Sequence, residues 1–232
     1  MTKPKKHKHI DCLVKATSIH TNEGAEVEVY DLKLSSATKT TLRRWAKHFR
    51  EHYCQDSKID ALMQGTQYKT RKEYLLNLAF PNREGFGPAT RSGDFTEILV
   101  SDFIESVLDF WVPRTRYRLK QIPNESPKGS DIVGMKFESG PTKHRPNDAL
   151  ITFEVKASMA IKNENRLQHA IDDAKKDAFD DIHTGDARGA FRVGLTLNAL
   201  KHRFIDVDDN RGWKAVERFQ DPIARPYVHR IG

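Results

Sequence analysis

The 232-residue chain lacks the features that mark several large classes of protein. Its two cysteines, Cys12 and Cys54, are too few for a disulfide scaffold and lack the CxxC spacing of a metal or redox site. No uncharged apolar run approaches the roughly 20 residues that a membrane-spanning helix needs. No apolar stretch follows the N-terminal lysines, as it would in a secretory signal peptide. We therefore expect a cytoplasmic protein with no membrane partner.

Two catalytic motifs with fixed spacing are missing as well. The chain has no GxSxG and no phosphate-binding GK(S/T) sequence, which argues against a serine hydrolase and against ATP hydrolysis by this chain. Its composition is that of a globular protein, with 38% hydrophobic and 9% aromatic residues. The 39 Lys and Arg against 32 Asp and Glu give a net charge of +7, which favours an anionic partner, most commonly nucleic acid, without identifying one.

Glycines and prolines at 81–93 divide the chain into two predicted parts. Residues 1–89 comprise a basic arm, expected to be mobile over residues 1–9, and a small N-terminal αβ subdomain. Its apolar patterns predict a hairpin of strands 12–19 and 25–34, then helices 40–53 and 59–80. In residues 90–232 the same patterns predict a helix at 94–111, strands at 116–122, 130–137 and 149–157, a helix at 163–183 and a strand at 191–200. The second part therefore has the order αβββαβ.

The strand at 149–157 places charge on one of its two faces. Alternate side chains of a strand share a face, so Ile151, Phe153 and Val155 are expected in the core. Glu154 and Lys156 then lie together on the other face. A solvated ion pair is the commoner explanation of such a pair, but a carboxylate beside an ammonium also suits metal-assisted hydrolysis.

Two further acids favour the hydrolytic interpretation. Asp131 begins the preceding strand and, in an antiparallel pair, reaches the same end of the sheet as Glu154. Mg²⁺ prefers such hard oxygen ligands. Glu97 lies early in the helix at 94–111, and we prefer it to Asp94 as a third acid, although either could simply stabilise the helix N-terminus.

These acids lie in motifs that resemble a known nuclease superfamily. Glu97, Asp131 and the Glu154–Lys156 pair, in αβββαβ order, are similar to the PD-(D/E)xK superfamily and its restriction-endonuclease-like fold, a mixed sheet flanked by helices. Ser130 replaces the proline of that motif. The segments RSGDFTEILVSDFIE, GSDIVG and ITFEVKAS, in a basic chain of this length, also resemble the HamA family, the nuclease subunits of the Hachiman anti-phage system.

This resemblance implies a function in detail. It implies Mg²⁺-dependent hydrolysis of DNA, with Mn²⁺ as a substitute, in which Asp131, Glu154 and Glu97 hold the metal and Lys156 acts on the attacking water. It further implies a complex with a helicase subunit, HamB, that restrains the nuclease until infection or DNA damage is sensed. Two alternatives stay open: a catalytically inactive subunit that only binds nucleic acid or its partner, and a restriction endonuclease acting alone.

Three weaker features remain. Arg114, Arg116, Arg118 and Lys120 alternate along the strand at 116–122 and its approach, as a row for a phosphate backbone or as a solvated face. Gln168 is a candidate site residue, although a solvent-facing helix position explains it more simply. His48 and His52 have the i, i+4 spacing of a metal pair, but no third ligand is evident nearby, and we interpret them as surface histidines.

Overall fold

A computed structural model describes residues 6–117, 120, 122–125, 130–140, 143–157, 168–169, 171–172 and 188–232. Its helices are η1 Lys8–Cys12, η2 Leu34–Ser36, α1 Lys39–Tyr53, α2 Ile59–Met63, α3 Arg71–Tyr74, the π-helical η3 Leu75–Ala79, α4 Gly87–Ser106, α6 Arg188–Ile205 and α7 Asn210–Glu217. Its strands are β1 Leu13–Lys15, β2 Ile19–His20, β3 Glu26–Val27, β4 Tyr30–Leu32, β5 Ile132–Lys136, β6 Ala149–Phe153 and β7 Val228–Ile231. The α/β class predicted from the sequence is confirmed.

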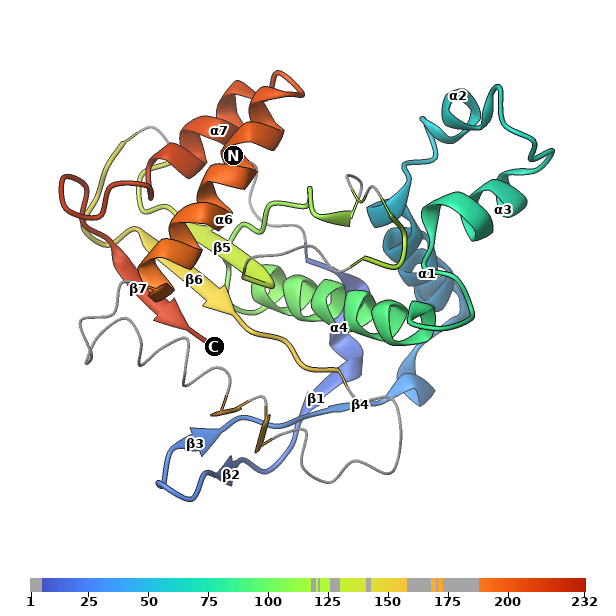
Figure 1. The fold of residues 1–232 in the computed structure, drawn as a ribbon. Coiled ribbons are helices and arrows are strands. Elements are labelled where there is room, and N and C mark those ends of the chain that lie inside the picture. The colour runs from blue at the N-terminus through green and yellow to red at the C-terminus, as the bar shows by residue number, and fades with distance from the viewer. Residues whose placement is uncertain are drawn as a thin grey trace.

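A three-stranded sheet lies at the centre, with helices on both faces (Figure 1). β5 and β6 are antiparallel, and β7 pairs with β6 in parallel, so the sheet is mixed. One face packs on α6 and α7 through an apolar cluster that includes Met135, Leu150, Leu197 and Phe219. The other face packs on α4 around Ile104. Burying both faces explains why β5 and β6 are continuous apolar runs.

The N-terminal part forms a paired hairpin and a group of helices. β1 pairs with β4 and β2 with β3, both antiparallel, around the predicted turn at 22–24. Thr38 caps α1 by accepting a hydrogen bond from the Thr41 amide. This cap lies two residues before residue 40, where the sequence predicts that the helix begins. The single helix predicted at 59–80 is wrong, because the chain turns at Gly65, where φ is +81°, and three short helices replace it. The predicted division between residues 89 and 90 stays a prediction, although it falls inside α4.

Two strand predictions in the second part are wrong. Among the described residues of 116–122 there is no strand; instead, Trp111 exchanges two 2.8 Å backbone hydrogen bonds with Met135 of β5. The segment 191–200 belongs to helix α6, and the C-terminal β7 supplies the strand beside β6. The described elements of this part follow in the order α4, β5, β6, α6, α7 and β7. The exact order αβββαβ stays a prediction. Most of the helix predicted at 163–183 lies outside the described residues.

A buried ion pair joins the start of β6 to the C-terminal part. Arg218 donates through Nε to Asp148 Oδ2 at 2.7 Å, and both side chains are almost completely buried. Arg218 also donates to the carbonyl oxygens of Arg145 and Arg225, while Asp148 accepts the amides of Glu138 and Arg145. This network fixes the approaches to β6 and β7, at the end of β6 opposite to Glu154.

The two cysteines are free and buried, as expected for ordinary small residues. Within the part of the chain that the structure describes, no helix combines the length and apolar character needed to span a membrane.

Candidate active site

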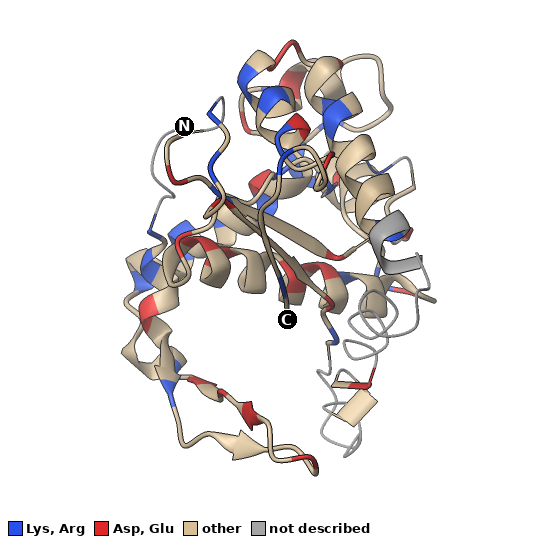
Figure 2. Ribbon diagram, turned by 90° about the vertical axis from the view of Figure 1, so that its left-hand side faces the viewer, with Lys and Arg blue, Asp and Glu red and all other residues tan. Residues whose placement is uncertain are grey.

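Acidic residues are spaced along α4 (Figure 2), and three of them, Asp94, Glu97 and Asp102, are buried. The segment after Val112 supplies counter-charges. The ion pairs are Asp94–Lys120, Glu97–Arg116, Asp102–Arg114 and Glu105–Arg114. The solvated face, one of the two alternatives for these cations, is therefore wrong for the described positions, because Arg114, Arg116 and Lys120 pair with acids of α4. Their contact with phosphate stays a prediction. Arg118 lies outside the described residues. Burial explains this arrangement, since a carboxylate removed from water needs a partner of opposite charge.

Glu97 contacts two residues of the facing segment. Tyr117 donates its hydroxyl to Glu97 Oε2 at 2.5 Å, and Arg116 Nε lies 3.2 Å from the same oxygen. Burial raises the pKa of Glu97 to about 7, against the lowering effects of Arg116 and Tyr117. Asp94, by contrast, is held by Lys120 and Tyr53 on the side away from the sheet end. Of the two acids considered, Glu97 is the one that shares a guanidinium with Asp131.

Asp131 and Glu154 lie at the ends of two paired strands. The antiparallel register pairs Ile132 with Phe153, so the next residue on each strand is Asp131 on β5 and Glu154 on β6. Asp131 Oδ2 accepts the Val155 amide at 2.9 Å, and Oδ1 lies 3.3 Å from the Arg116 guanidinium. Burial raises the pKa of Asp131, the Glu154 charge raises it further, and the Val155 amide opposes both. Burial and a neighbouring acid both disfavour the charged form of Asp131, so a cation bound beside it would stabilise this carboxylate.

Lys156 and Arg192 flank Glu154. Lys156 Nζ donates to Glu154 Oε1 at 2.8 Å, and Arg192 of α6 donates to Oε2 at 3.2 Å. Ile151, Phe153 and Val155 pack on the α4 side, as the strand alternation predicts. The alternation thus turns Glu154 toward the α6 side, where Arg192 meets it. The Lys156 side chain is partly open to solvent, with about 35% of it exposed.

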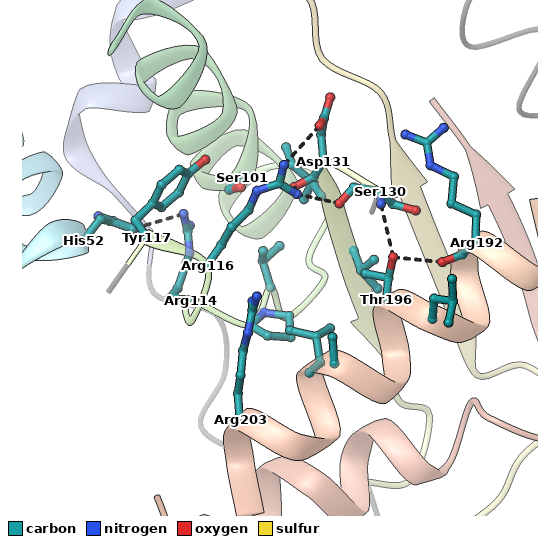
Figure 3. Close-up of a pocket in the computed structure, with 17 residues that line it drawn as sticks. His52, Ser101, Arg114, Arg116, Tyr117, Ser130, Asp131, Arg192, Thr196 and Arg203 are labelled. Carbon is teal, nitrogen blue, oxygen red and sulfur yellow. Dashed lines mark hydrogen bonds and ion pairs between the residues drawn. The ribbon is translucent and has the colours of Figure 1, made fainter. Parts of the chain in front are cut away.

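A cavity of about 470 Å³ lies beside Asp131, between α6, the start of β5 and the segment 112–117 (Figure 3). Arg114, Arg116, Arg192 and Arg203 all contribute to its wall. Figure 3 shows Arg116 reaching from this segment to Asp131 and the Ser130 carbonyl, with Arg203 entering from the far end of α6. Burial and the Arg116 charge lower the pKa of Arg203. A concentration of guanidinium groups beside two acids suits an anion such as a phosphate diester.

The predicted site residues thus form a linked series. Arg116 connects Glu97 to Asp131, the Val155 amide connects Asp131 to β6, and Glu154 contacts Lys156. The three carboxylates do not all lie within 4.8 Å of one another in the described structure. Asp131 and Glu154 are the pair that the strand register brings together.

Sequence reasoning missed the contribution of α6. Arg192 and Arg203 lie in or next to the segment read as a strand, although Leu197, Leu200 and Phe204 recur at helical spacing and are buried. Gln168 is exposed and donates to Asp172 Oδ1 at 2.8 Å, as a solvent-facing helix position would.

His48 and His52 are not surface histidines. His52 is buried, with Nδ1 donating to the His48 carbonyl and Nε2 accepting from Arg114. His48 donates through Nε2 to Asp102 Oδ1 at 2.9 Å. His9, assigned to a mobile arm, is buried too. The prediction failed because the acid that gathers these histidines lies on α4, far along the sequence.

Comparison with known proteins gives a family. No curated protein and no solved structure matches the chain. A family model, HamA, matches residues 7–232, which is essentially the whole chain and includes the motifs around Glu97, Asp131 and Glu154. The chain therefore belongs to the HamA family and, with it, to Hachiman anti-phage defence.

Proposed function

We propose that this chain is a metal-dependent DNA nuclease of the PD-(D/E)xK type that acts in Hachiman defence. The observation that carries the proposal is the juxtaposition of Asp131 and Glu154 at the ends of two paired strands, with Lys156 bonded to Glu154. Membership of the HamA family supports the defence role. The arginine-lined cavity beside Asp131 supports a phosphate-containing substrate.

The donor set fits Mg²⁺, with Mn²⁺ as a substitute. Mg²⁺ is commonly held by one or two carboxylates, with water and substrate phosphate completing its coordination. Asp131 and Glu154 would provide these carboxylates, and Glu97, joined to Asp131 through Arg116, would complete or support the site. When bound, Mg²⁺ supplies positive charge that stabilises the phosphate as it reacts.

The chain's own cations then have separate tasks. Lys156, held by Glu154, would orient the attacking water and offset the negative charge that develops on the phosphate. Arg192 donates a hydrogen bond to the second Glu154 oxygen and so holds this carboxylate in position. Arg116 and Arg203 face the cavity, where they would hold the DNA backbone against the site.

The proposed nuclease activity also gives a role for a partner protein. A nuclease that cleaves DNA without restraint would damage its own cell, so its activity must depend on a signal. The helicase subunit HamB, as the second Hachiman component, would supply this restraint in a hetero-complex. The absence of a GK(S/T) motif in this chain is consistent with ATP hydrolysis by the partner.

Plasmid cleavage tests the proposal. Purified chain, alone and in complex with HamB and ATP, should cleave plasmid DNA in Mg²⁺ or Mn²⁺ and not in EDTA. The isosteric variants Asp131→Asn and Glu154→Gln should each lose cleavage, whereas Glu138→Gln, at an exposed acid outside the site, should not. DNA binding without cleavage under every condition would instead favour a binding subunit with a nuclease-like fold.

A further inference from the structure

The N-terminal segment is anchored to the body of the protein by histidines. His9 is 4% exposed and stacks on Trp45 of α1, with ring centroids 4.7 Å apart and planes within 4° of parallel. Its Nε2 donates to Asp102 Oδ2 of α4 at 2.8 Å. The segment that begins at η1 is therefore fixed between α1 and α4.

Asp102 is the centre of this cluster and is completely buried. Besides His9, it accepts hydrogen bonds from His48 Nε2 at 2.9 Å and from Arg114 at 2.7 Å, both to Oδ1. His7 Nε2 lies 3.6 Å from the same Oδ1. Three histidines from two separate elements thus converge on one carboxylate.

The charges of the cluster do not balance without a further cation. Asp102 and the neighbouring Glu105 carry two negative charges, and Arg114, which bonds to both, supplies one positive charge. A metal ion held beside Asp102 would offset the remaining negative charge.

The geometry favours a metal ion. In the described part of the chain, His7, His48 and Asp102 form the only group of three ligand residues whose donor atoms all lie within 4.8 Å of one another. Ligand atoms of a tetrahedral zinc site lie about 3.3 Å apart, given bond lengths near 2.0–2.1 Å. The distances of 2.9 Å from His48 and 3.6 Å from His7 to Asp102 Oδ1 lie on either side of that value.

The donor types select the metal. Two imidazole nitrogens and one carboxylate oxygen suit Zn²⁺ and similar transition metals, whereas Mg²⁺ prefers oxygen ligands alone. His9 would orient Asp102 from outside the site, as carboxylate–histidine pairs do in metal centres. We propose that His7, His48 and Asp102 bind one Zn²⁺, which fastens the N-terminal segment to α1 and α4. This site is separate from the Mg²⁺ site proposed above and does not depend on nuclease activity.

Metal stoichiometry on the full-length chain tests this site. After removal of metal by a chelator, the protein is dialysed against Zn²⁺ in excess Mg²⁺, and bound zinc is measured by elemental analysis. Wild type should hold one zinc per chain. His7→Ala and His48→Ala should each weaken zinc binding by about 100-fold or more, since even supporting residues outside a metal shell contribute 10–100-fold. The matched control His20→Ala, on exposed β2, should bind as wild type does.

A second measurement covers the case in which a variant loses its fold. Co²⁺ bound to wild type should give the intense visible absorption of a four-coordinate site, and Zn²⁺ should abolish it and raise the midpoint of thermal unfolding. Absence of stoichiometric zinc would overturn the proposal, as would zinc that survives both histidine substitutions but is lost in Glu154→Gln. A thermal midpoint that rises in mild acid but does not respond to Zn²⁺ would show that a proton, and not a metal ion, stabilises the cluster. That result would overturn the proposal as well.

Discussion

Replacement of Arg218 should destabilise the protein more than replacement of any exposed arginine. Arg218 is 3% exposed, and Asp148, its partner, is completely buried. In Arg218→Met the Asp148 carboxylate keeps its two backbone amide donors but loses the only side chain that the structure pairs with it among the described residues. Breaking a buried ion pair in this way costs about 3–5 kcal/mol. Because the total free energy of unfolding of a domain is only about 5–15 kcal/mol, this loss should be easy to measure.

Urea unfolding followed by circular dichroism measures this loss. Arg211→Ala is the matched control, since Arg211 is exposed at the start of α7, the helix that ends just before Arg218. It should change the free energy of unfolding by no more than about 0.5 kcal/mol. Asp148→Asn should restore part of the stability of Arg218→Met, because it removes the unpaired charge while keeping an acceptor oxygen. A loss below about 1 kcal/mol in Arg218→Met would refute the reasoning.

Three further predictions concern the site. Burial raises the pKa of Glu97 from 4.5 to about 7, so in EDTA the wild type should lose up to about 3 kcal/mol of stability as pH rises from 4.5 through 7. Glu97→Gln should lack this dependence, and equal urea midpoints at pH 5 and pH 8 in the wild type would contradict it. If DNA lies in the cavity, Arg203→Ala should reduce the slope of log DNA affinity against log salt concentration by about one, as measured by fluorescence anisotropy. The control Arg211→Ala should leave this slope unchanged. Identical slopes for the two variants would count against DNA in the cavity. Deleting residues 228–232 exposes the edge of β6 and removes the Gly232 carbonyl that accepts the Glu154 amide, so the midpoint of thermal unfolding should fall markedly. An unchanged midpoint would contradict a stabilising role for β7.

Local patterns predicted the part of the site that depends on local geometry. The period-two alternation of β6 correctly placed Ile151, Phe153 and Val155 in the core, and the antiparallel pairing aligned Asp131 with Glu154. Both follow from strand geometry alone, which a sequence pattern expresses directly.

The rest depended on contacts between distant residues. The alternation of Val193, Leu195 and Leu197 indicated a strand, yet Leu195 is exposed and the helical repeat through Leu200 and Phe204 is the one that packs on the sheet. β7 has four residues, too few for a clear pattern, and it forms because β6 offers it an open edge.

The ion pairs of the cation row and the burial of the histidine pair escaped prediction for one shared reason. Arg114 and Arg116 look like solvent-facing residues until α4 places Asp102 and Glu97 opposite them. His48 lacks a third ligand in the local sequence because His7 and Asp102 lie 41 and 54 residues away along the chain. Ion pairs of this separation leave no periodic signal.

DNA cleavage by Lys156→Ala, with DNA binding measured in parallel, tests the central claim most directly. Lys136→Ala is the matched control, since Lys136 is an exposed lysine of β5 outside the site. In the complex with HamB, ATP and Mg²⁺, Lys156→Ala should lower the cleavage rate by about 100-fold or more while its DNA affinity and thermal midpoint match those of Lys136→Ala. Equal cleavage by the two variants would contradict a nuclease site built on Glu154 and Lys156.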